Sequence, residues 1–169
     1  MIAGPRRKPL VAVLAVVMIA CLSACTSSKE TNVSGMTPQQ SKARALAMEQ
    51  EIAGRLPKDA VVSVDPSRGG TLISCAGDGV YSRAAGVTIH IAEGTDPATL
   101  LPALAESYSS DTRFQVRDVD SDYRSAIQLS GEYAEGYVIG TTGGEHALVV
   151  DSFSPCFELP PTMSPFDDF

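Results

Sequence analysis

The fold is decided by the stretch Leu72-Ile73-Ser74-Cys75-Ala76-Gly77-Asp78-Gly79-Val80-Tyr81-Ser82-Arg83. Gly77-Asp78-Gly79 separates two short runs of strand-forming residues, which is the pattern of a β-hairpin. The next residues favour a further strand, because Val87, Ile89 and Ile91 alternate with Thr88 and His90. Gly86, just before this alternation, predicts a β-bulge. The middle of the chain is therefore expected to form antiparallel strands.

Two helices are predicted on either side of these strands. Thr37-Pro38-Gln39-Gln40 has the layout of a capping box, so the first helix is expected to begin there. Its apolar stripe has spacings of three and four residues and ends near Gly54 and Pro57; the members are Ala45, Met48, Ile52 and Leu56. The second helix is expected from Asp96-Pro97 to about Ser109, with Pro102 either kinking it or marking a start nearer Thr99.

The remaining sequence predicts four more strands joined by turn-forming residues. They lie near Phe114 and Val116, from Tyr123 to Leu129, from Tyr133 to Ile139, and from Ala147 to Phe153. Short connections favour antiparallel neighbours. The predicted fold class is α+β: an antiparallel sheet with two helices packed on one face and one structural disulfide. The expected order is helix, two or three strands, helix and a four-strand meander.

The N-terminus has the pattern of an export signal. Arg6, Arg7 and Lys8 precede an apolar run of 11 residues, from Leu10 to Ala20, which is too short to span a bilayer comfortably. Leu22-Ser23-Ala24-Cys25 then resembles the lipobox of bacterial lipoprotein signal peptides. That resemblance implies cleavage between Ala24 and Cys25 and a diacylglycerol thioether on Cys25. The alternative is an ordinary secretory peptide in which Cys25 has no special role.

Charge and composition divide the chain into four parts, namely a signal peptide (1–24), the lipidated Cys25 with a tether (25–36), one α+β domain (37–157) and a Pro-rich acidic tail (158–169). The chain has 13 Lys and Arg against 20 Asp and Glu, a net charge of −7. Cleavage removes three cations and leaves 10 against 20, so the mature charge would be −10. Such a protein is repelled by anionic lipid and nucleic acid. The lipid alone is therefore expected to anchor it, and no nucleic-acid partner is predicted.

Two cysteines remain after the signal peptide and the lipidated residue are set aside, Cys75 and Cys156. In an exported chain they are expected to form a disulfide. That bond would join the first hairpin to the exit of the last strand and, on the chain-entropy model, contribute about 4.5 kcal/mol. The alternatives are a metal site with His90 and His146, whose spacings do not suggest one, and a redox pair, which usually has the Cys-x-x-Cys spacing.

Other candidate chemistry is weak. Asp118, Asp120 and Asp122 begin like a calcium loop, but Tyr123 stands where the loop needs glycine and Leu129 where it needs glutamate. An acidic hairpin tip explains the same residues.

His90 is expected on the sheet face opposite Val87 and Ile89, as a surface or partly buried residue. Tyr133 and Tyr137 either present a binding face or pack under a helix. No cofactor motif occurs, and no cofactor is predicted.

The arrangement as a whole resembles small lipoproteins of high-GC Gram-positive bacteria. The resemblance rests on the lipobox, the Ser/Thr-rich tether, Ser74-Cys75 before Gly-Asp-Gly, the Pro-started helix and the final run Ser152-Phe153-Ser154-Pro155-Cys156. It implies a location and a fold, and no catalytic residue. The expected function is a lipid-anchored, non-enzymatic binding or accessory module on the extracytoplasmic face of the cell membrane, with an envelope protein or the cell wall as partner. The alternatives are an envelope hydrolase and a carrier of lipid or another small ligand.

Overall fold

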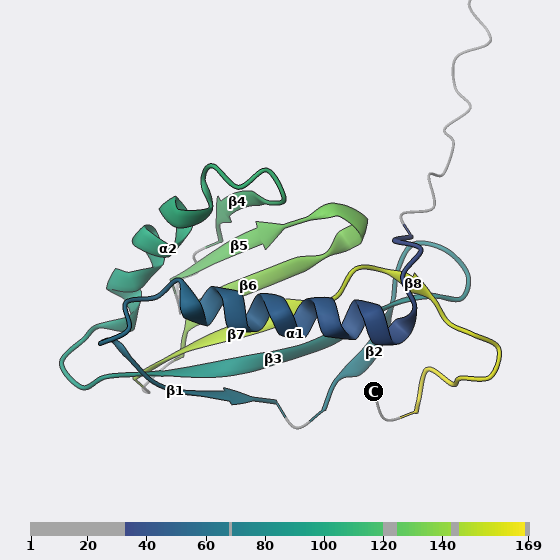
Figure 1. Cartoon of the computed structure of the whole chain (residues 1–169), viewed down its shortest axis with the longest axis horizontal. Coiled ribbons are helices and arrows are strands. Elements are labelled where there is room, and N and C mark those ends of the chain that lie inside the picture. The colour runs from purple at the N-terminus through teal and green to yellow at the C-terminus, as the bar shows by residue number, and fades with distance from the viewer. Residues whose placement is uncertain (1–32, 68, 120–124, 143–145, 168–169) are drawn as a thin grey trace, which may run out of the picture. The chain divides into compact units, whose positions relative to one another are not determined.

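The described part of the chain is an antiparallel sheet of eight strands with two α-helices, a mixed α+β fold (Figure 1). The computed structural model describes residues 33–67, 69–119, 125–142 and 146–167. The chain divides into two units, Met1–Glu30 and Thr31–Phe169. The first unit lies outside the described residues, so every element belongs to the second.

The first helix, α1, spans Pro38–Gly54, and the prediction of its start is confirmed. The hydroxyl of its N-cap residue, Thr37, accepts a hydrogen bond from the Gln40 amide at 3.2 Å. In return, the Gln40 side chain accepts one from the Thr37 amide at 2.9 Å. These bonds satisfy two amides for which a helix start has no backbone partner. Met48 and Ile52 of the predicted stripe are buried, so this face of α1 packs against the sheet.

The second helix is a composite. A 3₁₀ turn, η1, spans Pro97–Leu100, and α2 spans Leu101–Tyr108. Asp96 caps the 3₁₀ turn, because its carboxylate accepts a hydrogen bond from the Ala98 amide at 3.0 Å. Pro102 lies in the first turn of α2, where the missing amide hydrogen costs no helical bond. The helical segment therefore begins at Pro97, as predicted, whereas its α-helical part begins at Leu101, two residues after the alternative start at Thr99.

The sheet is built from a long central strand, its neighbours and a meander. The strands are β1 (Val61–Pro66), β2 (Thr71–Ser74), β3 (Val80–Ile91), β4 (Gln115–Asp118), β5 (Ala126–Ser130), β6 (Gly136–Thr141), β7 (Ala147–Phe153) and β8 (Phe157–Glu158). Their order in the sheet is β1-β3-β7-β6-β5-β4, and β2 and β8 also pair with β3. Every pairing is antiparallel. The predicted β2–β3 hairpin and the meander of β4 to β7 are confirmed.

Two features of the sheet differ from the prediction. Gly86 is not a bulge: β3 pairs with β7 without a shift from Ala84 to His90. The irregularity lies instead between Val61 and Ser63, in the unpredicted strand β1. Glycine at position 86 has another cause, because a Cβ there would lie 2.3 Å from the Val150 carbonyl oxygen. The residue allows two strands to approach closely.

The sixth strand begins later than predicted. β6 starts at Gly136, and Tyr133 lies in a short 3₁₀ turn, η2 (Glu132–Ala134), with φ at +55°. Tyr133 and Tyr137 therefore do not share a strand face. Tyr137 is fully buried in the core, which confirms packing for that residue, whereas Tyr133 is partly exposed. The turn that follows Gly131 therefore replaces the first residues of the strand predicted from Tyr133 to Ile139.

The helices cover one face of the sheet only in part. In Figure 1, α1 lies across β3 and β7, and α2 lies beside β4 and β5. Both helices contribute to one core with alternate residues of the strands. Its fully or almost fully buried members include Met48, Ile52, Leu104, Tyr108, Val87, Ile89, Leu129, Tyr137, Ile139, Leu148 and Val150. The space between helices and sheet is filled by these side chains.

Part of the interior near α1 is polar. Glu49 is buried, and its carboxylate accepts a hydrogen bond from the Ser152 hydroxyl at 2.5 Å. Arg83 is also buried, and burial lowers the pKa of its guanidinium while the charge of Glu49 opposes this effect. A buried charge is tolerated only where opposite charge or hydrogen bonds compensate it. Polar groups therefore contribute to the contact between α1 and the sheet.

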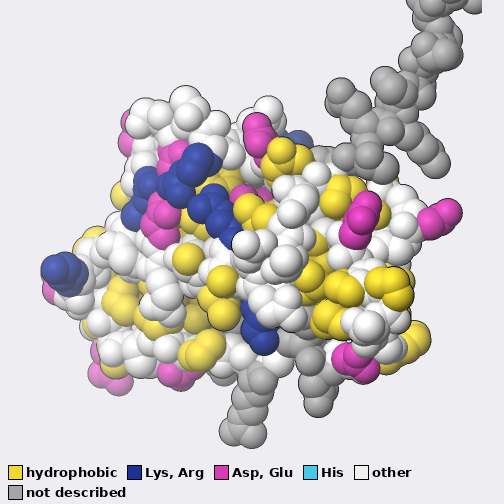
Figure 2. Space-filling model, turned by 45° about the vertical axis from the view of Figure 1, so that its right-hand side comes forward, with side chains coloured by type: hydrophobic (Ala, Val, Ile, Leu, Met, Phe, Trp, Pro, Cys, Tyr) yellow, Lys and Arg dark blue, Asp and Glu magenta, His cyan; other side chains and the backbone are white. Residues whose placement is uncertain are grey.

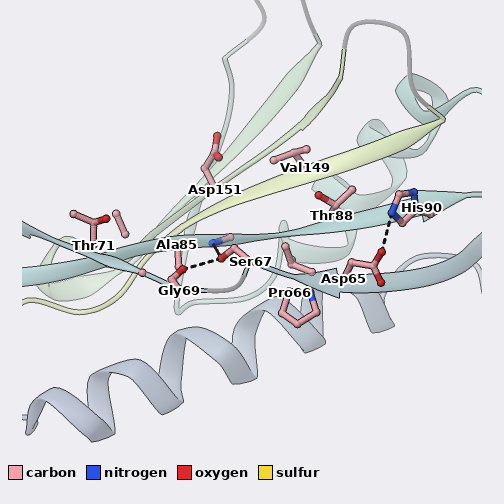
Figure 3. A pocket seen from close by; sticks show the side chains of 14 residues that line it. Asp65, Pro66, Ser67, Gly69, Thr71, Ala85, Thr88, His90, Val149 and Asp151 are labelled. Atoms are coloured by element: carbon pink, nitrogen blue, oxygen red, sulfur yellow. Dashed lines mark hydrogen bonds and ion pairs between the residues drawn. The ribbon is translucent and has the colours of Figure 1, made fainter. Parts of the chain in front are cut away.

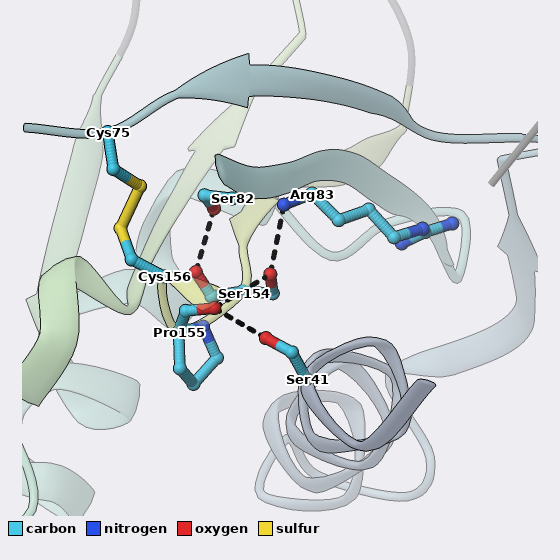
Figure 4. Close-up of a disulfide and its surroundings, with 7 residues drawn as sticks. All are labelled: Ser41, Cys75, Ser82, Arg83, Ser154, Pro155 and Cys156. Carbon is cyan, nitrogen blue, oxygen red and sulfur yellow. Dashed lines mark hydrogen bonds between the residues drawn. A yellow bond between two sulfur atoms is a disulfide. The ribbon is translucent and has the colours of Figure 1, made fainter. Parts of the chain in front are cut away.

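The disulfide joins the hairpin to the end of the last long strand, as predicted (Figure 4). The Cys75 and Cys156 sulfur atoms are 1.99 Å apart, and the two Cα atoms are 6.4 Å apart. The Ser82 hydroxyl donates to the Ser154 carbonyl at 2.7 Å, and the Ser41 hydroxyl of α1 donates to the Pro155 carbonyl. Strand β8, which follows, pairs with the start of β3. Covalent and polar contacts thus connect three elements at this end.

Candidate functional site

The candidate site lies on the face of the sheet that points away from α1. Residues of β3 and β7 alternate between the two faces, so Val87 and Val150 enter the core while their neighbours point outward. Thr88 and Val149 form one outward pair in the strand register, and Gly86 lies opposite Asp151. The side chains of Thr88, Val149 and Asp151 are partly exposed. Figure 3 shows them pointing away from the helix.

This face contains a shallow depression with a volume of about 580 Å³. One wall comes from the end of β1 and the loop that follows, and the floor comes from β3 and β7 (Figure 3). Three neighbouring residues of β3 that line it are small, namely Ala84, Ala85 and Gly86. The polar lining residues are Asp65, Ser67, Thr71, Thr88, His90 and Asp151. The surface is therefore a mixture of polar and apolar groups and is open to solvent.

His90 and Asp65 form a pair at one end of the depression. The Nε2 atom of His90 lies 3.0 Å from Oδ2 of Asp65. The two side chains are 43% and 65% exposed, so water screens the interaction. The position of His90 beside Thr88, opposite the apolar residues of β3, confirms the sequence prediction. The exposed imidazole and carboxylate can therefore form hydrogen bonds with a polar partner.

Neither nearby serine completes a nucleophilic arrangement with His90. The Ser67 hydroxyl accepts a hydrogen bond from the Gly86 amide at 3.2 Å and donates to the Gly69 carbonyl at 3.1 Å. Gly86 is four residues from His90, or about 13 Å along the strand, so Ser67 is far from the imidazole. Ser63 lies opposite His90 in the register, but no side-chain hydrogen bond joins these two described residues. The geometry does not assemble a serine, histidine and carboxylate triad here.

Several predicted site residues lie outside the described residues. These are Ala24 and Cys25, so lipidation and cleavage stay predictions, and Asp120 and Asp122 of the weak calcium candidate. Asp118 is the last residue of β4. His146 is exposed beside the end of β3, where its carbonyl accepts a hydrogen bond from the Ile91 amide at 2.8 Å. In the described ranges, no group of three or more His, Cys, Asp or Glu is placed to hold a metal ion.

A second recess lies between α2 and the edge of the sheet. Its volume is about 530 Å³, and α2 contributes Leu101, Pro102 and Ala105 to it. Val116 and Ile127 line the opposite side, with Arg117 and Asp118 at the strand. This recess is open rather than enclosed, and it is more apolar than the depression on the other face.

A third recess, of about 390 Å³, surrounds a buried carboxylate. The Arg44 Nε atom of α1 donates to Glu135 Oε1 at 2.9 Å, and the Tyr137 hydroxyl donates to the same oxygen at 2.7 Å. Burial, and secondly this hydrogen bond, raise the pKa of Tyr137 well above its ordinary value. The network fixes the turn before β6 against α1, so its first role is structural.

The sequence prediction does not identify the residues that line the β1 side of the depression. Asp65 and Ser67 lie in or after β1, and that strand was not predicted. The run Val61-Val62-Ser63-Val64 is rich in β-branched residues, and Pro66 ends it as at a sheet edge. This signal is sufficient to suggest a strand. The approach of Asp65 to His90 depends on strand pairing, which the local pattern does not specify.

Comparison with known proteins adds a single distant likeness. No protein-family profile matches the chain, and no curated protein matches it. Among solved structures, the chain is similar to a DUF4853 family protein from Actinomyces odontolyticus, with a TM-score of 0.39 and 20% sequence identity. The similarity covers 74% of this chain and 66% of the other, just under two thirds of its length.

No helix in the described ranges is long and apolar enough to cross a membrane.

Proposed function

We propose that the protein is a lipid-anchored component of the bacterial cell envelope whose folded domain binds a partner through the uncovered face of its sheet. The anchor is the diacylglycerol expected on Cys25, and the domain lies on the extracytoplasmic side of the cell membrane. The disulfide between Cys75 and Cys156 supports export, because such bonds persist in oxidising compartments. Membership among small lipoproteins of high-GC Gram-positive bacteria is part of this proposal.

The observation that carries the binding role is the difference between the two sheet faces. One face packs against α1 and α2, whereas the other presents Thr88, His90 and Asp151 around an open depression. An apolar patch alone would favour a hydrophobic partner, but this surface combines apolar side chains such as Val149 with the polar groups of Asp65, Thr88 and His90. A protein or cell-wall partner with hydrogen-bonding groups fits it, since polar interfaces rely on hydrogen bonds and bridging water. Nucleic acid is disfavoured by the acidic charge.

The alternatives receive less support from the same geometry. A carrier of lipid needs an apolar cavity between helix and sheet, and that space holds core side chains such as Met48 and Leu148. A hydrolase that uses His90 needs a nucleophile within hydrogen-bonding distance, and Ser67 is engaged elsewhere. Binding is therefore the function that the described residues support best.

Lipidation is tested by replacing Cys25 with alanine in the full chain, expressed in a high-GC Gram-positive host. We expect loss of metabolic palmitate labelling and either an uncleaved precursor or release from the membrane. Labelling at the wild-type level in the C25A variant would overturn the anchoring proposal. A Cys21→Ala variant is the control, because that cysteine lies within the signal and should leave labelling unchanged.

Binding is tested by photocrosslinking in intact cells. A benzoylphenylalanine at position 88 should give a discrete adduct, and the same group at Leu46, exposed on α1, should not. Val149→Arg should reduce the position-88 adduct, because Val149 lies opposite Thr88 and extends into the depression. Equal adducts from positions 88 and 46, or none across growth conditions, would count against binding through this face.

A further inference from the structure

Three segments of the chain meet at Cys156. The Ser34 amide, near the end of the predicted tether (25–36), donates to the Cys156 carbonyl at 2.9 Å. The Cys156 amide donates to the Tyr133 carbonyl at 2.8 Å, and the disulfide connects Cys156 to Cys75 beside the β2–β3 hairpin. In Figure 1, the start of α1, β8 and the C-terminal segment lie together at the right-hand end. The point at which the tether enters the domain is therefore fixed.

The turn at this end holds a tyrosine in an unfavourable backbone conformation. Tyr133 and Ala134 have φ values of +55° and +58°, a region that residues with side chains seldom adopt. The bond from Cys156 to the Tyr133 carbonyl and a bond from Gly131 to the Glu135 carbonyl, at 2.8 Å, maintain the turn. The Tyr133 side chain is 38% exposed and borders a recess with Met36. Strain of this kind is often kept where a side chain has a function.

A second aromatic side chain is exposed on the C-terminal segment. The Leu159 amide donates to the Gly79 carbonyl at 2.9 Å, which fixes where this segment leaves the hairpin. Further along, the Ser164 amide donates to Asp167 Oδ2 at 2.8 Å and closes a turn. Phe166 in this turn is 95% exposed. Figure 2 turns the right-hand side of Figure 1 toward the viewer and shows hydrophobic side chains across that surface, with acidic ones among them.

The length of the tether restricts what this end can reach. Cys25 precedes Ser34 by nine residues, which span at most about 32 Å. A lipid on Cys25 would therefore keep Ser34, and the residues fixed around it, close to the bilayer surface. Tethering raises the effective concentration of a weak contact without requiring high affinity. Aromatic rings also partition favourably to the membrane interface.

We propose that the domain surface beside the tether, at Met36 and Tyr133, contacts the lipid bilayer and sets the orientation of the protein on the membrane, with the exposed Phe166 of the C-terminal segment as a second contact. The proposal rests on the proposed lipid anchor. The contact is apolar, because Glu132 and Asp167 flank the two aromatic residues and are repelled by anionic lipid. The partner is therefore the lipid surface itself, with the tether supplying proximity.

The chain has no tryptophan, so a single introduced tryptophan reports on its own position. The test uses the chain from Cys25 onward, coupled through the Cys25 thiol to maleimide lipids in phosphatidylcholine vesicles; Cys75 and Cys156 are bonded to each other and do not react. Phe166→Trp and Tyr133→Trp are expected to show a blue-shifted emission and several-fold protection from an aqueous quencher on coupling. Val62→Trp, on β1, is the matched control because Val62 is 69% exposed, and it should show neither change.

Lipid charge separates an apolar contact from an electrostatic one. On vesicles containing phosphatidylglycerol, the blue shift should decrease at low salt and return when salt screens the acidic residues. A shift that grows with anionic lipid at low salt would assign the contact to Arg44 and Arg113 and overturn the apolar proposal. Unshifted reporters on a coupled, disulfide-bonded protein, or equal shifts at position 62, would also overturn it. Because the maleimide supplies the anchor, these results are independent of palmitate labelling in cells.

Discussion

At Gly86, the backbone of β7 passes so close to β3 that no side chain fits between them. A Cβ at this position would meet the Val150 carbonyl oxygen at 2.3 Å, and that oxygen belongs to a strand held on both sides. Because neither strand can move without disturbing its neighbours, the contact is a firm restriction on the sequence. Position 86 therefore requires glycine for steric reasons, although its φ is not in the left-handed region.

The first prediction compares two glycines. Gly86→Ala should lower the free energy of unfolding by about 1–3 kcal/mol, because the methyl group forces the paired strands apart. Gly54→Ala is the control: a Cβ there meets nothing within 4 Å, and the helical position favours alanine by up to about 1 kcal/mol. Urea unfolding at pH 7 measures both. Equal stabilities for G86A and the wild type would show that β3 and β7 adjust freely.

The same residue shows what local sequence can and cannot specify. An isolated glycine in a strand pattern suggests either a bulge or a close backbone approach, and only the pairing with β7 decides between them. The hydrogen-bonded pair of His90 and Asp65 has the same origin, because it depends on the register of β3 with β1. The alternation that placed His90 on the outer face is local, and it was predicted.

At the scale of elements, helix starts and hairpins were readable because their signals are short. The Thr37 cap and the Gly77-Asp78-Gly79 turn each act within a few residues. The short strand β1 has a local signal in its β-branched residues, but its pairing with β3, which brings Asp65 close to His90, is not specified locally. The local pattern predicts a strand at Tyr133, but the turn there accepts a hydrogen bond from the Cys156 amide, which lies far along the chain. Contacts of that range leave no local pattern.

A charged network joins the end of α1 to the loop after α2. Arg113 Nη2 lies 2.6 Å from Asp111 Oδ2 and 2.7 Å from Glu51 Oε1, and Arg55 Nη2 lies 3.1 Å from Asp111. The hydrogen bonds from Arg113 hold the pKa of Asp111 well below its usual range, and they lower the pKa of Glu51 as well. Arg55 also stacks on the Tyr108 ring at 3.7 Å, and burial raises the pKa of that tyrosine to about 12.

The network predicts a loss of stability in acid. A carboxyl whose pKa is lower in the folded state stabilises that state above its ordinary pKa of about 3.9, and the contribution is lost as the pH falls toward the folded value. Unfolding free energies should therefore begin to fall below about pH 5 and should continue to fall as the pH approaches the lowered pKa of the folded state. Asp111→Asn should show a shallower fall, whereas Asp59→Asn, an exposed residue outside the network, should match the wild type. An unchanged slope in D111N would assign the acid sensitivity elsewhere.

At the scale of the whole molecule, the disulfide closes the chain around most of the sheet. Cys75 and Cys156 are 81 residues apart, and the intervening residues include β3 to β7 and α2. The hydrogen bonds of Ser154 and Pro155 hold the same region without the covalent bond. The native contacts can therefore survive its removal. The main consequence of the bond is expected in the unfolded chain, which it keeps compact.

The last prediction separates these two effects. The double variant Cys75→Ala, Cys156→Ala should fold, with a free energy of unfolding lower by up to about 4.5 kcal/mol on the chain-entropy model. If the bond acts on the unfolded state, the dependence of that free energy on urea should become steeper, because the open chain exposes more surface on unfolding. Loss of a native contact alone would lower the midpoint and leave the slope unchanged. Intact mass with and without reductant provides the control, and two alkylatable thiols in the unreduced native protein would refute the bond itself.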